Sequence, residues 1–241
     1  LRLARAAVPA ADSLSAALPE ARTAADRERI YVQLADLSAD SLSLAASFWE
    51  KALAEAVEAG DDYGCREALD RLVQKLAVRE PDRALQYIHL ADSLLPERRY
   101  ALFRSSLNAF WLWKQMSAAN SFEAIDRALA EFRERRPGSL TPEEQIEWEF
   151  LTGLSIDYSS IATEAYGNIP QAIPYVEKAL AKLEKYPFEE RVHLEKLCRE
   201  ELSNIYLYAD DPRAADQIRR NIDLHRAWLA ADTRFEWPRR D

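Results

Sequence analysis

Apolar residues recur every three or four positions along almost the whole chain, and no stretch sustains the alternation of apolar and polar residues that strands show. This spacing predicts α-helices, because residues three and four apart share one face of a helix. We expect eleven helices joined by short loops, over residues 9–18, 24–38, 42–59, 62–78, 82–95, 98–117, 121–135, 142–165, 169–185, 188–208 and 212–231. The predicted fold class is therefore all-α.

Several of these helices have start signals in the sequence. In Thr141-Pro142-Glu143-Glu144, a threonine at the N-cap is followed by proline at the first helical position. Glu144 stands three residues after the N-cap. This order predicts a capping box, in which Thr141 and Glu144 each bind the other's backbone amide. Asp211-Pro212 repeats the cap followed by proline, and Glu80-Pro81 does so with a weaker capping residue.

Every second predicted helix carries a small residue, an apolar residue four positions later and usually another small residue three further on. The six sets are Ala10/Leu14/Ala17, Ala45/Trp49/Ala52, Ala84/Ile88/Ala91, Ala124/Ala128/Glu131, Ala172/Val176/Ala179 and Ala214/Ile218/Asn221. Their first members are 35, 39, 40, 48 and 42 residues apart, which indicates a repeat. Small side chains allow two helices to approach closely, so the pattern predicts helical hairpins that stack side by side.

The segment Leu202-Ser203-Asn204-Ile205-Tyr206, followed by Asp210-Asp211 and Ala214-Ala215, resembles the tetratricopeptide repeat family. The same first-helix spacing recurs in two other places, at Leu151, Leu154, Ser155 and Tyr158 and at Tyr31, Leu34 and Ala35. Pro96 stands where the family often ends its second helix. The repeats are degenerate, because alanine or serine replaces glycine in the first helix, and elongated compared with the family period of about 34 residues.

The resemblance implies a single domain over residues 1–241 that forms a right-handed α–α superhelical solenoid. About five hairpins are expected, over residues 24–59, 62–95, 98–135, 142–185 and 188–231, after an unpaired helix at 9–18. In this family the first helix of each hairpin lines the concave surface, where partners bind.

Composition and charge narrow the classes of function. A net charge of −9 argues against nucleic acid as a partner, because binding phosphates normally needs a basic surface. Five glycines leave little material for nucleotide-binding loops. The longest uncharged stretch, residues 165–176, is 12 residues long and contains two prolines, whereas a membrane span needs about 20 apolar residues. We therefore expect no membrane insertion within this chain.

The sequence shows no set of residues that would catalyse a reaction. His89, His193 and His225 lie on different predicted helices, and Cys65 and Cys198 form no C-x-x-C motif. Either cysteine is more typical of a small buried residue than of a nucleophile, and whether the two pair is left open. We expect no metal, no cofactor and no enzymatic activity. An α-helical enzyme whose site comes from distant positions is the weakest alternative.

Candidate binding residues lie on two predicted first helices. Arg104, Asn108, Trp111 and Gln115 form one stripe at steps of four, three and four, and arginine and tryptophan are enriched at binding hot spots. The resemblance implies that this stripe faces the concave groove. It implies the same for Asn204 and Tyr208, which lie on a later first helix. The alternative is that Trp111 packs in the core with the Arg104 stem lying along it.

These observations favour a non-enzymatic module that binds a protein or peptide. The resemblance implies a context in the extracytoplasmic, periplasmic sensing region of a larger bacterial signalling or regulatory protein, with a cytoplasmic location as the alternative. A second hypothesis is a structural scaffold that self-associates through the final helix. That helix carries four large apolar residues, Ile218, Leu224, Trp228 and Leu229. The oligomeric state is left open.

Overall fold

The computed structural model describes residues 2–119, 122–134 and 138–231, and these residues form helices and loops without any strand. They divide into two compact units, Leu1–Glu97 and Arg98–Asp241, each treated separately below. The boundary falls between the second and third predicted hairpins, and the single domain over 1–241 stays a prediction. No helix in the described ranges is long and apolar enough to cross a membrane.

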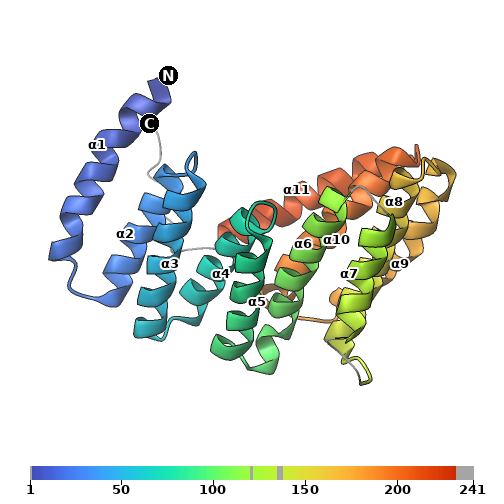
Figure 1. The fold of residues 1–241 in the computed structure, drawn as a ribbon, viewed down its shortest axis with the longest axis horizontal. Coiled ribbons are helices and arrows are strands. Elements are labelled where there is room, and N and C mark those ends of the chain that lie inside the picture. Colours follow the sequence, from blue (N-terminus) through green and yellow to red (C-terminus); the bar gives the residue numbers. More distant parts are fainter. Residues whose placement is uncertain (1, 120–121, 135–137, 232–241) are drawn as a thin grey trace. The chain divides into compact units, whose positions relative to one another are not determined.

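The first unit consists of five α-helices and one 3₁₀ turn (Figure 1). In chain order they are α1 (Arg2–Ala17), η1 (Leu18–Glu20), α2 (Ala24–Leu37), α3 (Leu42–Ala59), α4 (Asp62–Leu76) and α5 (Pro81–Leu94). Each helix packs mainly against the next helix in sequence, so that α2 contacts α3, α3 contacts α4 and α4 contacts α5. This succession is the one expected of consecutive helical hairpins.

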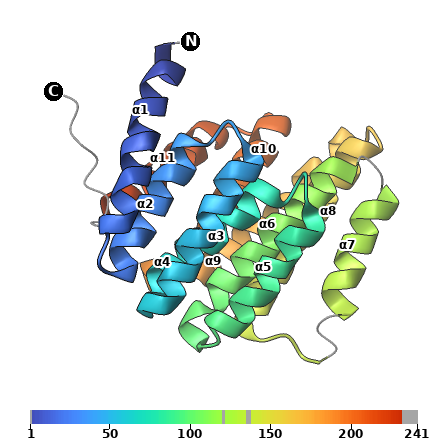
Figure 2. The ribbon, with the colours of Figure 1, turned by 60° about the vertical axis from the view of Figure 1, so that its left-hand side comes forward.

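Among the described residues, the second unit contains six α-helices, labelled in Figure 2, and two 3₁₀ segments. These are η2 (Arg98–Tyr100), α6 (Ala101–Ala119), α7 (Phe122–Glu134), α8 (Pro142–Ala162), η3 (Tyr166–Ala172), α9 (Ile173–Leu183), α10 (Phe188–Tyr208) and α11 (Ala214–Ala231). The all-α fold class is therefore confirmed for the described residues. The predicted ranges 42–59 and 188–208 coincide with α3 and α10.

Most predicted boundaries differ from the structure by one to three residues, and the two larger differences both involve proline. Helix α1 begins at Arg2 rather than at residue 9, because Pro9 removes one backbone donor without ending the helix. The helix expected at 169–185 is divided into η3 and α9, with Pro170 inside η3 and Pro174 in the first turn of α9. A 3₁₀ segment accommodates these prolines where a continuous α-helix would leave carbonyl groups without a donor.

The predicted capping box is confirmed at the start of α8. The Thr141 hydroxyl accepts from the Glu144 amide at 3.2 Å, and the Glu144 carboxylate accepts from the Thr141 amide at 2.8 Å. Glu80 precedes Pro81 as expected but makes no side-chain capping bond. Asp211 accepts from the Arg213 amide at 2.9 Å, just before α11 begins.

The repeated small–large–small sets form the contact faces of the second helix of several hairpins. Ala, a larger apolar residue and Ala are buried together in three complete sets, namely Ala45/Trp49/Ala52, Ala84/Ile88/Ala91 and Ala172/Val176/Ala179. In α11 only Ala214 of its set is buried, whereas Ile218 is exposed. The side chains of Ala124, Ala128 and Glu131 lie outside the described residues. The predicted burial of alanine is therefore confirmed for the sets on α3, α5 and η3–α9, whereas on α1 Ala10 is exposed and Leu14 and Ala17 are half-buried.

Helix α6 occupies the centre of the second unit. It packs against both α8 and α10, and α9 packs against the same two helices, while α8 and α10 contact each other only sparsely. In a nearest-neighbour solenoid, a helix of the third hairpin would not contact one of the fifth. The hairpins are present, but this packing does not confirm the predicted superhelical solenoid.

Helices α8 and α9 are in close contact at Gly153. A β-carbon at this position would lie 2.6 Å from Val176 Cγ2 and 3.3 Å from the Ala172 carbonyl oxygen. Val176 is fully buried, so its side chain has no free space into which to move. Glycine therefore sets the distance between the two helices, although the sequence suggested alanine or serine for such positions.

We expect Gly153→Ala to destabilise the protein by about 1–3 kcal/mol in urea unfolding, because overpacking outweighs the roughly 1 kcal/mol gain in helix propensity. The same substitution on a Val176→Ala background should be neutral or stabilising, because the clashing methyl groups are gone. Gly167→Ala is the matched control, since a β-carbon there meets no atom within 4 Å. Equal effects of Gly153→Ala on both backgrounds would contradict the assigned contact.

Candidate functional site

The predicted stripe on α6 lies on the helix that α8 and α10 cover. Asn108 and Trp111 are 3% and 8% exposed, and Arg104 and Gln115 are half-buried. The Asn108 side-chain amide donates a hydrogen bond to the Glu147 carboxylate on α8. A partner would contact Asn108 or Trp111 only if α6 were uncovered. The binding role of these four residues stays a prediction.

The other two predicted residues lie on α10, where Asn204 is half-buried and Tyr208 is exposed. Tyr208 is close enough to Tyr158 of α8 to influence its ionisation. Burial and the Glu201 carboxyl raise the pKa of Tyr158, which accepts a 2.8 Å hydrogen bond from Trp113 Nε1. The structure thus brings Asn204 and Tyr208 to a polar region between α8 and α10. Their role in binding stays a prediction.

Two carboxyl groups are buried in this region, Asp157 on α8 and Glu201 on α10. They are 2% and 0% exposed. Neither Glu201 oxygen has a hydrogen-bond partner among the described residues, and Asp157 Oδ1 has none either. Burial and then the neighbouring Asp157 carboxyl raise the pKa of Glu201 well above its ordinary value. Two adjacent buried carboxyl groups do not both ionise readily, so we infer that Glu201 retains its proton in the folded protein.

A cleft of about 270 Å³ opens between α9, α10 and α11. Its apolar lining comes from Leu180 and Ala181 on α9 and Leu202 on α10. Leu180 and Leu202 are buried, and Ala181 is exposed at the side of the cleft. Small-molecule sites commonly measure about 300–1,000 Å³, so this cleft suits part of a larger partner better than a drug-sized ligand.

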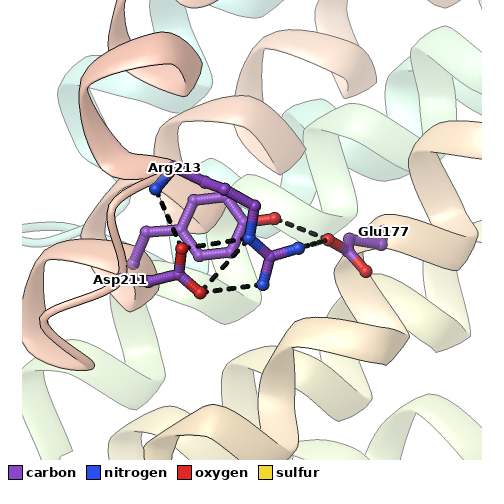
Figure 3. A network of polar contacts seen from close by, with 4 residues as sticks. Glu177, Asp211 and Arg213 are labelled. Atoms are coloured by element: carbon purple, nitrogen blue, oxygen red, sulfur yellow. Dashed lines mark hydrogen bonds and ion pairs between the residues drawn. The ribbon is translucent and has the colours of Figure 1, made fainter.

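Arg213 at the start of α11 connects three elements at one side of the cleft (Figure 3). Its guanidinium lies between Asp211, at 2.8 Å, and Glu177 of α9, also at 2.8 Å. It also lies over the Tyr206 ring of α10, 4.5 Å from the ring centre, and the Tyr206 hydroxyl donates to Glu177 at 2.5 Å. One arginine and one glutamate therefore join α9, α10 and α11.

The ionisation of this network is fixed by its own hydrogen bonds. Hydrogen bonding to Asp211 raises the pKa of Arg213, and the same contact lowers the pKa of Asp211. Burial, and then donation to Glu177, raises the pKa of Tyr206. At neutral pH Arg213 and Asp211 are charged, and Tyr206 remains a hydrogen-bond donor.

The other two arginines of the cleft also have acidic partners. Arg199 on α10 binds Glu195 at 2.7 Å, and Arg220 on α11 binds Asp216 at 2.8 Å. Glu195 is buried and also binds Arg191 at 2.8 Å. The lining contains three arginines (199, 213 and 220) and three carboxylates (177, 184 and 216), so its formal charge is zero.

Sequence reasoning missed most of this cleft. Arg213, just before α11, is followed at steps of four and three by Gln217 and Arg220, which share one face of α11. That spacing is visible in the sequence, whereas the family resemblance implies a binding surface on first helices. Tyr206 and Asp211 belong to the motif that carried the resemblance, yet nothing in the motif indicates a cleft beside them.

The described residues hold no group of three or more His, Cys, Asp or Glu side chains placed to bind a metal ion. Cys65 and Cys198 are both buried free thiols. Burial, with nearby acidic groups, raises the pKa of Cys65 to about 11, so its thiolate is scarce at neutral pH. In this structure both cysteines pack as small apolar residues.

Comparison with protein-family models gives no match for this chain, and no curated protein is significantly similar to it.

We expect Glu201→Gln to stabilise the protein at pH 7 by about 1–3 kcal/mol. The folded state holds a proton that the unfolded chain releases above the ordinary glutamate pKa of 4.5, so wild-type stability falls as pH rises above that value. The stability of the Glu201→Gln variant should fall much less than that of the wild type as pH rises. Thermal unfolding between pH 5 and 8 measures this difference.

Glu200→Gln is the matched control, because Glu200 is the exposed neighbour of Glu201 on α10. It should change the stability little and reduce the pH dependence only slightly, because Glu200 raises the pKa of Glu201 less than burial and Asp157 do. If Glu201→Gln instead destabilises the protein at pH 7, the Glu201 carboxyl is ionised and held by a partner. The inference that Glu201 retains its proton is then wrong.

Proposed function

We propose that this chain is a non-enzymatic, tetratricopeptide-like helical module that binds a peptide or a peptide segment of a protein in the cleft between α9, α10 and α11. The observation that carries this proposal is the cleft itself, with its apolar floor of Leu180 and Leu202 and its rim of paired arginines. Apolar surface supplies affinity, and a few fixed polar groups orient the ligand.

The size and charge of the cleft favour a peptide over a small ionic ligand. A volume of about 270 Å³ accommodates one or two side chains of a longer segment. Each arginine in the lining already has a carboxylate partner, so an anionic ligand would have to replace an existing ion pair. Such an exchange gains little free energy near the surface.

The wider context that we propose is the extracytoplasmic sensing region of a larger bacterial signalling or regulatory protein, on the resemblance to helical repeats in such regions. The sequence of the full-length gene product tests this context separately from the binding proposal. An export signal before Leu1 and a membrane span after Asp241 would support it.

Filling the cleft should abolish peptide binding. We expect peptides enriched from a random displayed library on the 1–241 chain to bind at least about tenfold more weakly to Ala181→Trp, because the indole would occupy the apolar floor. Isothermal titration calorimetry with the synthetic peptides measures the change.

The matched control is Ala215→Trp, which adds the same side chain at an exposed alanine of α11 outside the cleft lining. It should leave the affinities within about twofold of the wild type. The proposal fails if no peptide is enriched over an empty surface, or if Ala181→Trp binds the enriched peptides as well as Ala215→Trp does.

A self-associating scaffold is the second candidate function, and one feature of α11 favours it. Ile218 and Ile222 are 37% and 46% exposed and lie one helical turn apart. Leu224, which was expected to form part of the self-associating surface, is buried and does not contribute to it. The side chains of Trp228 and Leu229 lie outside the described residues.

The scaffold hypothesis predicts a concentration-dependent increase in mass that Ile218→Arg with Ile222→Arg reverses, because two charges would have to be buried in the interface. Multi-angle light scattering from 1 to about 200 μM measures this mass, with Arg219→Glu as an exposed control on the same helix. A monomer at every concentration would exclude the scaffold.

A further inference from the structure

A five-residue segment occurs twice in the chain, once in each unit. Residues 50–54 and 177–181 both read Glu-Lys-Ala-Leu-Ala. The first copy lies on α3 and the second on α9. In each copy the glutamate directly follows the large residue of a small–large–small set. The two glutamates therefore occupy the same position of the repeat.

Each of these glutamates binds an arginine of the next hairpin. Glu177 on α9 binds Arg213 at 2.8 Å, and Glu50 on α3 binds Arg83 on α5 at 2.5 Å. Both arginines stand directly before the first alanine of the next small–large–small set. The two ion pairs therefore join the same two repeat positions, in different units.

A tyrosine and a second carboxylate complete each ion pair. In the first unit, the Tyr87 hydroxyl donates to Glu50, and Glu80 at the start of α5 binds Arg83 at 2.8 Å. In the second unit, the same contacts come from a tyrosine of α10 and from Asp211 (Figure 3). A charge network of this kind holds its geometry better than an isolated pair at the surface does.

The ion pairs connect helices that otherwise scarcely meet. Among the described residues, α9 and α11 both pack against α10 and make little direct contact with each other. The described parts of α3 and α5 are related to α4 in the same way. Each pair thus joins the second helices of neighbouring hairpins past the first helix that separates them in the sequence.

In the second unit, the ion pair belongs to the proposed binding cleft. Glu177 and Arg213 both line the cleft, together with Leu180 and Leu202. Because the pair ties α9 to α11, it restrains two of the three helices that form the cleft. A site that already has its bound geometry avoids the cost of becoming ordered when the ligand arrives.

We propose that Glu177 and Arg213 form a latch that sets the spacing of α9 and α11 and so positions the cleft for its peptide, and that Glu50 and Arg83 form the equivalent latch of the first unit. The Arg213 and Glu177 side chains are 54% and 42% exposed, so dissolved salt screens their attraction. Peptide affinity therefore depends on ionic strength even where the peptide carries no charge. This effect on binding rests on the proposed peptide-binding function, whereas the latch itself can be tested without a ligand.

Distances between spin labels test the latch in the free protein. Lys178→Cys on α9 and Arg219→Cys on α11 introduce labels at exposed positions outside the latch, and both natural cysteines are buried. Double electron–electron resonance should give one narrow distance distribution, which Glu177→Gln should widen. Labels at the equivalent exposed positions of the first unit, Lys51 and His89, should respond in the same way to Glu50→Gln.

Arg220→Gln is the matched control for the second unit. Arg220 also lines the cleft, but it pairs with Asp216 on its own helix and does not reach α9 through that pair. Its substitution should leave the distance distribution and the peptide affinity as they are in the wild type.

A double-mutant cycle tests what the latch does for binding. The probes are peptides from the displayed library that have blocked ends and no ionisable side chain. Glu177→Gln and Arg213→Gln should each weaken them about two- to fivefold in calorimetric titrations, and the double variant should be no weaker than either. If each side chain instead contacts the peptide independently, the losses add.

Ionic strength provides a second readout of the same effect. Wild-type affinity for the uncharged probes should fall about two- to fivefold between 50 and 500 mM salt, and Glu177→Gln should lose most of this dependence. Glu50→Gln should leave both the affinity and its salt dependence within about twofold of the wild type, because the cleft lies in the other unit.

A distance distribution that Glu177→Gln leaves unchanged would overturn the latch, whether or not any peptide binds. Additive or absent losses in the double-mutant cycle would overturn its effect on binding. If the library yields no peptide, the proposed function fails, and the spin-label distances still decide whether Glu177 and Arg213 hold α9 and α11 together.

Discussion

Close approach of helices through small residues is the constraint on which the structure depends. Ala45 and Ala52 on α3 and Ala84 and Ala91 on α5 are buried beside one large residue each. On α8, the absence of a side chain at Gly153 leaves room for Val176. At this separation the facing side chains interdigitate at the density of a crystal, so dispersion and apolar burial are both large. The cost is that any polar group on these faces must be satisfied inside the protein.

The polar groups of the second unit follow from that constraint. Asn108 reaches Glu147, and Trp113 donates to Tyr158, so α6 is joined to α8 by hydrogen bonds within an otherwise apolar interface. Burial beside Asp157 raises the pKa of Glu201, from which we infer that this carboxyl retains its proton. Toward the surface, the same requirement is met by ion pairs, and Arg213 binds Asp211 and Glu177 at once. Burial alone does not make a carboxyl group neutral, because the buried Glu195 is paired with both Arg191 and Arg199.

The sequence predicted the helices well because their signals are local. Three- and four-residue periodicity, the Thr141 capping box and the alanine sets depend on neighbours within one or two turns. The contact of α6 with α10 was not predictable in this way, because it depends on how three hairpins pack together. The same holds for the cleft. The face of α11 that carries Arg213 and Gln217 is visible in the sequence, whereas the space beside Leu202 exists only once α9 and α11 are in place.

The contact between Gly153 and Val176 also limits how this protein can evolve. The two residues are 23 positions apart in the sequence, yet each fixes the volume available to the other. A larger residue in place of the glycine becomes acceptable only after the valine has been shortened. In lineages that descend from this sequence, Val176 should therefore be shortened before Gly153 is replaced by a larger residue.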